Sequence, residues 1–173
     1  MASYYYLISS LPMLRAQGEP PMDYPAFLSQ CRSAVNGGVY KTLEELSVGS
    51  DKGPLLSDWA SFYGMLSQEL CYQRSVKLGR PYPVPSDRDA GIVQAVTAAV
   101  NAENPLEGEQ ILLNLEFRCL DDMIGLHNFD EHALYGYAMK LQLLERQRLF
   151  QHDRGKQAFD GLMDSIRQQI SSL

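Results

Sequence analysis

The sequence predicts an all-α fold, a helical bundle of about six to seven helices. Apolar residues recur about every three or four positions along most of the chain, and few stretches alternate between apolar and polar residues as strands do. Short segments rich in proline and glycine separate the periodic stretches. A chain of 173 residues is long enough for one domain with its own core. We therefore expect a single helical domain over residues 1–173, with 1–80 and 86–173 as candidate sub-lobes.

Two conformations are open to residues 1–12. The run from Tyr4 to Ile8 is aromatic and β-branched enough to be extended, and Pro12 ends it in either conformation. A polar loop over residues 17–25 follows. The first clear helix is then expected from about Tyr24 to Val35, because an Asn-Gly-Gly sequence comes directly after it.

The longest amphipathic pattern lies in the next part of the chain. A short helix over Val39–Leu46 is expected first, and a long helix then begins near Pro54, a residue tolerated at the first helical position. Large apolar side chains recur from Trp59 onward at helical spacing. Gly79, followed by a proline, supplies the stop signal for this helix.

Capping residues predict the starts of the later helices. Ser86 is expected to cap a helix that runs to about Ala102. Asn104 caps the next helix, which runs to about Leu126, with a proline in its first turn. Asp130 begins a further helix with an apolar stripe along one face, and a last helix opens near Asp153.

Glycines interrupt several of these helices, and each costs about 1 kcal/mol relative to alanine. Close helix crossings or dependence on a partner would explain them, but we favour simple tolerance by a well-packed bundle. The interrupting residues are Gly64, Gly91, Gly108, Gly136 and Gly161.

Composition excludes several classes of function. The net charge of −6 argues against general nucleic-acid binding, and no apolar run approaches the roughly 20 residues that span a bilayer. No basic segment precedes the first apolar run, so we expect a cytoplasmic protein rather than a secreted one. The cysteines, Cys31, Cys71 and Cys119, are widely spaced, which predicts buried thiols without a disulfide framework.

Two groups of basic residues are candidate partner-binding sites. The long helix ends in Arg74, Lys77 and Arg80 with no acidic residue between them. These cations either complement the helix dipole or dock an acidic partner surface, and both interpretations stay open. A second basic patch is expected around the end of the helix that begins at Asp130. It comprises Arg146, Arg148, Arg154 and Lys156.

No motif predicts catalysis, a cofactor or a metal. The phosphate-loop, dinucleotide and nucleophile-elbow patterns are absent from the sequence. The segment from His127 to His132 holds two imidazoles and two carboxylates but lacks the spacing of a helical metal motif. A row of acids from Glu103 to Asp122 is interpreted as a solvated helix surface rather than a catalytic pair. The alternative is a small-ligand- or metal-binding protein or an enzyme that uses the Glu116–His132 neighbourhood.

Three segments together resemble a family of uncharacterised bacterial proteins associated with V/A-type ATPases. They are Tyr4–Pro12, Glu69–Arg80 and the long run Asn104–Gly155, and from the first to the last they extend over most of the chain. The matching features within the last run are Asn104–Glu107, Leu126–Asp130, Tyr137–Arg146 and Gly155. The family is in turn distantly similar to the central-stalk subunit called C in prokaryotes and d in eukaryotes.

The resemblance implies a non-catalytic, all-helical protein of a proton- or sodium-translocating ATPase. Such a subunit seats the rotating central shaft on the membrane rotor ring, so the implied partners are the stalk and ring subunits. The stalk subunit is a longer, lobed funnel, and a second chain would be needed to complete that socket. The implied location is cytoplasmic and peripheral to the membrane. A transient assembly or regulatory factor of the ATPase is a further alternative.

Overall fold

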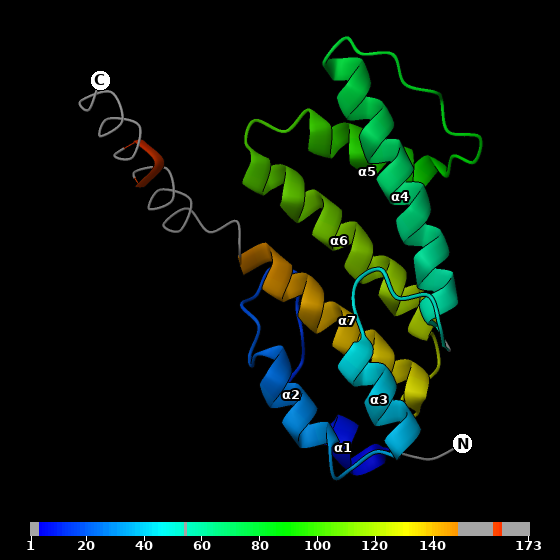
Figure 1. The fold of residues 1–173 in the computed structure, drawn as a ribbon, viewed down its shortest axis with the longest axis vertical. Coiled ribbons are helices and arrows are strands. Elements are labelled where there is room, and N and C mark those ends of the chain that lie inside the picture. Colours follow the sequence, from blue (N-terminus) through cyan, green and yellow to red (C-terminus); the bar gives the residue numbers. More distant parts are fainter. Residues whose placement is uncertain (1–3, 54, 149–160, 164–173) are drawn as a thin grey trace, which may run out of the picture.

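The computed structural model describes residues 4–53, 55–148 and 161–163. The described residues up to 148 form seven helices, and no described residue lies in a strand, which confirms the all-α prediction (Figure 1). The helices are α1 (Tyr5–Ser10), α2 (Tyr24–Cys31), α3 (Gly37–Glu45), α4 (Leu56–Lys77), α5 (Ala90–Val100), α6 (Pro105–Ile124) and α7 (Glu131–Arg148). Residues 161–163 are helical, and the rest of the helix predicted from Asp153 lies outside the described residues.

Helix α7 is the central element of the bundle. It packs against α2, α3 and α6, and it occupies the middle of the molecule in Figure 1. Its residues Leu134 and Leu143 are both fully buried, although nine positions of an α-helix place them on opposite sides of the axis. The predicted apolar stripe, which includes Leu134 and Leu141, is buried, but α7 is also buried outside it because neighbouring helices cover it from several sides.

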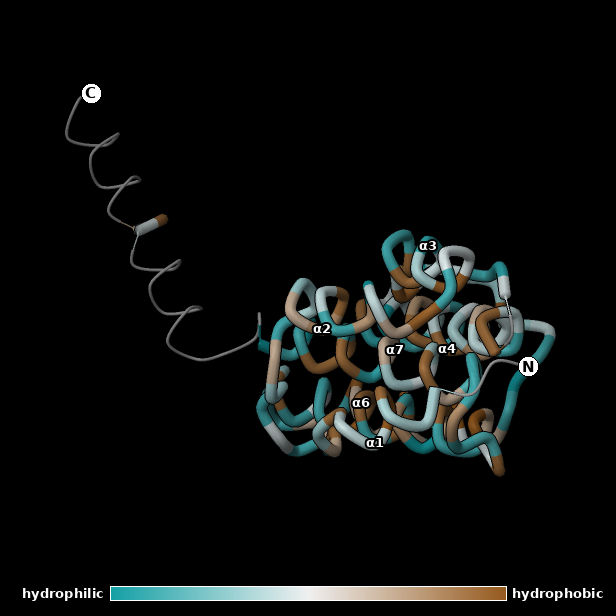
Figure 2. The backbone as a smooth tube through the Cα atoms, turned by 90° about the horizontal axis from the view of Figure 1, so that it is seen from below, coloured by the Kyte–Doolittle hydropathy of each residue, from teal (hydrophilic) through white to brown (hydrophobic). Residues whose placement is uncertain are grey.

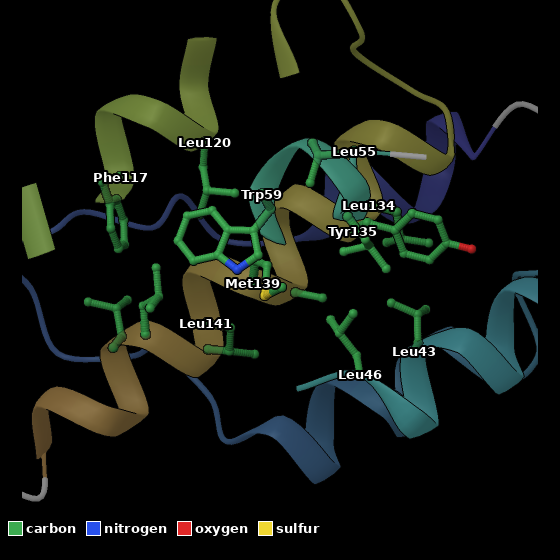
Figure 3. Close-up of a cluster of buried hydrophobic side chains, with 14 of the residues drawn as sticks. Leu43, Leu46, Leu55, Trp59, Phe117, Leu120, Leu134, Tyr135, Met139 and Leu141 are labelled. Atoms are coloured by element: carbon green, nitrogen blue, oxygen red, sulfur yellow. The ribbon is translucent and has the colours of Figure 1, made fainter. Parts of the chain in front are cut away.

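Trp59 of α4 ties the long helix to this centre. Its side chain is fully buried, and Figure 3 shows the indole among side chains of α6 and α7 that include Leu120 and Met139. The indole N–H donates a hydrogen bond of 2.8 Å to the carbonyl of Val48, so the one polar atom of the ring is satisfied. Figure 2 shows hydrophobic stretches of the helices turned towards this interior.

Side-chain caps fix where most of the helices begin. Asn104 accepts a hydrogen bond from the amide of Glu107 at 2.8 Å, as predicted. The cap predicted at Ser86 is wrong. Asp89 caps α5 instead, because its carboxylate accepts hydrogen bonds from two first-turn amides and complements the helix dipole. The opening segment, whose conformation was open, is the short helix α1.

Helices α4, α5 and α6 pack on one another, so the connection over residues 78–89 joins two helices in contact. The crossing of α5 and α6 is close at Gly108. A Cβ built there would lie 2.7 Å from the backbone carbonyl oxygen of Ala99. Close crossing therefore explains this glycine, whereas nothing lies within 4 Å of a Cβ at Gly64.

We compared the described helices with the requirements for spanning a membrane. None of them combines the length and the apolar content that crossing a bilayer requires.

We predict opposite effects of alanine at two helix-interior glycines. Gly108→Ala should lower the free energy of unfolding by about 1–3 kcal/mol, because a backbone oxygen blocks the new methyl group. Gly64→Ala, the control, should raise it by about 0.5–1 kcal/mol through better helix propensity. Urea denaturation measures both, and a stabilising Gly108→Ala would contradict the close crossing.

Candidate functional site

The C-terminal end of α4 is the candidate docking surface, and it is rigidly built. Gly79 adopts a left-handed conformation with φ of 66°. The amide of Arg80 then donates to the carbonyl of Ser75 at 2.9 Å, and the amide of Gly79 donates to Val76 at 3.0 Å. This pair of bonds is a Schellman motif, which confirms the predicted stop at Gly79.

Three cations surround this helix end, which we call the α4 tip, defined by Arg74, Lys77 and Arg80. All three side chains are exposed. None of them forms an ion pair with a carboxylate in the described residues. Lys77 donates a hydrogen bond to the carbonyl of Val100, the last residue of α5, so it also stabilises that helix end. Arg74 and Arg80 have no such role in the described structure.

A groove of about 540 Å³ lies beside the α4 tip, where the ends of α4 and α5 meet the start of α6. Its lining is mainly apolar, with Leu70 and Leu112 among the side chains and Arg74 and Lys77 at its edge. Leu78, at the end of α4, is 66 % exposed and also lines the groove. Apolar surface beside unpaired cations is typical of a protein interaction site.

The second predicted basic patch is divided by the structure. Arg148 is exposed in the last turn of α7 and has no ion-pair partner in the described part of the chain. Arg154 and Lys156 lie outside the described residues. Arg146, in contrast, points into the interface between α6 and α7, where its guanidinium binds Glu116 with two hydrogen bonds of 3.0 and 2.6 Å.

Glu116 is buried, with only 1 % of its surface exposed, so the acidic row of α6 is not uniformly solvated as the sequence predicted. Burial raises the pKa of the Glu116 carboxyl, and the Arg146 guanidinium opposes that shift. Arg146 also binds Glu109 at 2.8 Å, and this second carboxylate lines the groove beside the α4 tip. Glu109 is the one acidic residue among the described lining residues, so the two cations that also line the groove, Arg74 and Lys77, leave it with a positive formal charge.

A second internal ion pair fixes the loop that follows the α4 tip. Glu69 of α4 is buried, and its carboxylate accepts two hydrogen bonds, of 2.9 and 2.6 Å, from Arg88 just before α5. The hydrogen bonds from Arg88 lower the pKa of the Glu69 carboxyl. The sequence signal for this pair was weak, because the two residues lie in different elements with a proline-rich turn between them.

The cysteines differ in their surroundings. Burial raises the pKa of the Cys31 and Cys119 thiols to about 11 in each case, which makes both poor nucleophiles. Cys71 is exposed, so the prediction of a buried thiol is wrong there.

The Glu116–His132 neighbourhood, the alternative site for ligand or metal chemistry, does not form one site. Glu116 forms an ion pair with Arg146, whereas His127, Asp130 and His132 lie together at the start of α7. The imidazole of His127 bonds to one oxygen of Asp130, and the amide of Ala133 donates to the other at 3.2 Å. Burial acts to raise the pKa of Asp130, but these hydrogen bonds outweigh it and lower the pKa.

Comparison of this chain with models of protein families, with curated proteins and with solved structures gives no match.

We predict that the two arginines near the end of α7 respond differently to substitution. Arg146→Gln should destabilise the fold by about 3–5 kcal/mol, because it leaves the buried Glu116 carboxylate without its cation. Arg148→Gln, two positions further on, should change the free energy of unfolding by less than about 0.5 kcal/mol. Equal stability of both variants in urea denaturation would refute the structural role of Arg146.

The Glu69 ion pair predicts a pH dependence of stability. A carboxyl whose pKa is lower in the folded protein stabilises the fold above its ordinary pKa of 4.5, and this contribution is lost as the pH falls through the folded value. Glu69→Gln should therefore cost about 1–3 kcal/mol at pH 7 and flatten the loss of stability on the acid side. Glu45→Gln, in an exposed pair of 3.9 Å, is the control and should retain the wild-type pH profile.

Proposed function

We propose that this chain is a non-catalytic subunit or accessory protein of a V/A-type proton- or sodium-translocating ATPase. It would help to couple the rotor shaft to the membrane ring, through contacts with subunits of the central stalk and the rotor ring. One observation carries the proposal. The α4 tip presents three cations without carboxylate partners in the described residues beside an open apolar groove, and it belongs to one of the segments that resemble the ATPase-associated family.

Charge and shape at the α4 tip suit an acidic partner. The protein has a net charge of −6, so most of its surface would repel an acidic partner. The group of cations at the α4 tip would attract such a partner. The apolar lining of the groove adds an area that a partner side chain can bury, since Leu70, Leu78 and Leu112 all face it. An acidic helix or loop with an apolar side chain at its centre matches both features.

The rigidity of the α4 tip supports a coupling role. The Schellman motif at Gly79 fixes the helix end, and the Glu69–Arg88 ion pair holds the following loop against α4. A surface that is ordered before binding loses little conformational entropy when a partner docks. A coupling subunit has to transmit torque, so rigid helices joined by short anchored loops fit that task.

A stable subunit, a transient factor and an enzyme would each require different properties of this chain. A stoichiometric subunit stays with the purified ATPase, whereas an assembly or regulatory factor binds only transiently. An enzyme of the Glu116–His132 neighbourhood would need Glu116 free to act, yet both of its carboxylate oxygens accept hydrogen bonds from Arg146. The docking function is therefore the one that the described geometry favours.

We predict that charge reversal at the α4 tip weakens binding to the ATPase. The double variant Arg74→Glu with Arg80→Glu should reduce capture of stalk and rotor subunits at least tenfold in a pull-down from the same organism, because attraction becomes repulsion. Lys77 is left intact, since it also bonds to the end of α5. The melting temperature should change little, as both substituted side chains are exposed.

A matched control variant changes the net charge by the same amount at another part of the surface. Lys41→Glu with Lys52→Glu alters two exposed lysines away from the groove and should retain binding. If the wild-type chain captures no ATPase subunit, the proposed function is wrong. If both double variants lose binding equally, net charge rather than the α4 tip is responsible.

A further inference from the structure

Two histidines and an aspartate converge at the turn between α6 and α7, in the half of the molecule away from the α4 tip (Figure 1). His127 lies in the turn, Asp130 precedes α7, and His132 lies in its first turn. One candidate ligand atom from each residue lies within 4.8 Å of the others, and all three side chains are partly buried. Residues 127–132 lack the spacing of a helical metal motif because a helix start separates the two histidines, but the fold brings these side chains together.

Hydrogen bonds of the turn hold these residues in place. The amide of His127 donates to the carbonyl of Ile124 at 2.9 Å, which turns the chain back directly after α6. One Asp130 oxygen caps α7 by accepting from Ala133, so the other oxygen is directed at His127. The imidazole rings of His127 and His132 stack at 4.1 Å between centroids, with an angle of 8° between their planes. The three side chains are therefore gathered before any ligand arrives.

We propose that His127, Asp130 and His132 together bind one divalent transition-metal cation of the zinc class. Neutral imidazole nitrogens and a carboxylate oxygen are ligands that zinc takes, at about 2.0–2.2 Å. The cation takes one ligand atom from each of the His127 ring, the Asp130 carboxylate and the His132 ring. Water completes the coordination. This site is independent of the docking function proposed for the α4 tip.

Metal binding requires two changes in the side chains of this cluster. Two ligand atoms at about 2.1 Å from one ion lie at most about 4.2 Å apart, so a spread of 4.8 Å needs only small side-chain rotations. The stacked imidazoles must also tilt open, because a metal lies in the plane of each ring that binds it, and parallel planes do not meet. Asp130 and Glu131 supply negative charge that offsets the positive end of the α7 dipole.

The site has a structural consequence for the N-terminal helix. The amide of Tyr4, next to α1, donates to the carbonyl of Phe129 at 2.7 Å, and the Tyr5 and Phe129 rings are 4.7 Å apart. Phe129 lies directly before Asp130. A metal bound at this turn therefore stiffens the segment to which α1 is attached and raises the thermal stability of the folded protein.

Titration calorimetry of the full chain with ZnCl₂, in a buffer that does not chelate metals, tests the proposal. We expect one equivalent to bind and the melting temperature to rise. His127→Ala, His132→Ala and Asp130→Asn should each weaken binding at least tenfold. Asparagine is also a good helix cap, so Asp130→Asn removes the charge without removing the cap. The control, His152→Ala, changes the third histidine of the chain and should leave zinc affinity unchanged.

Cobalt(II) provides a second measurement on the same proteins. The wild type should give the visible absorption of a low-coordinate nitrogen and oxygen site, and His132→Ala should lose it. Absence of stoichiometric zinc binding by the wild type overturns the proposal. Undiminished binding by His132→Ala or by Asp130→Asn also overturns it, because the ion would then lie at other ligands, such as the exposed thiol of Cys71.

Discussion

Burial of α7 on several sides is the constraint on which the rest of the structure depends. A helix surrounded by others needs apolar residues around most of its circumference, and α7 supplies them from Leu134 to Leu144. Helices α2, α3 and α6 pack on it, and Trp59 of α4 enters the same core. The interior has no room for a solvated charge, so the arginine that follows this apolar run, Arg146, needs buried carboxylates as partners.

The basic residues fall into two groups, those that pair with buried carboxylates and those without a carboxylate partner in the described residues. Arg146 pairs with the buried Glu116 and Arg88 pairs with the buried Glu69, so both arginines stabilise the fold through internal carboxylates. Arg74 and Arg80 remain exposed, with no carboxylate paired to them in the described residues. The Arg146–Glu109 contact links the two groups, because Glu109 also lines the groove beside Arg74 and Lys77.

Features that depend on local sequence could be predicted, and features that depend on long-range contacts could not. The Asn104 cap and the Gly79 stop are set by residues within one turn of each helix end, so the sequence was sufficient. The Glu116–Arg146 pair joins residues 30 positions apart, and nothing in either helix pattern identifies the partner. Ser86 and Asp89 are both good caps by type, and only the path of the preceding loop decides between them.

The docking role of the α4 tip is the central functional claim, and proximity to a partner tests it most directly. Cross-linking through lysines, followed by mass spectrometry, can be performed on a mixture of the chain with an intact V/A-type ATPase. Our account predicts cross-links from Lys77 to subunits of the central stalk or rotor ring, because Lys77 borders the groove. Cross-links that arise only from Lys41 and Lys52, or none above background, would contradict it.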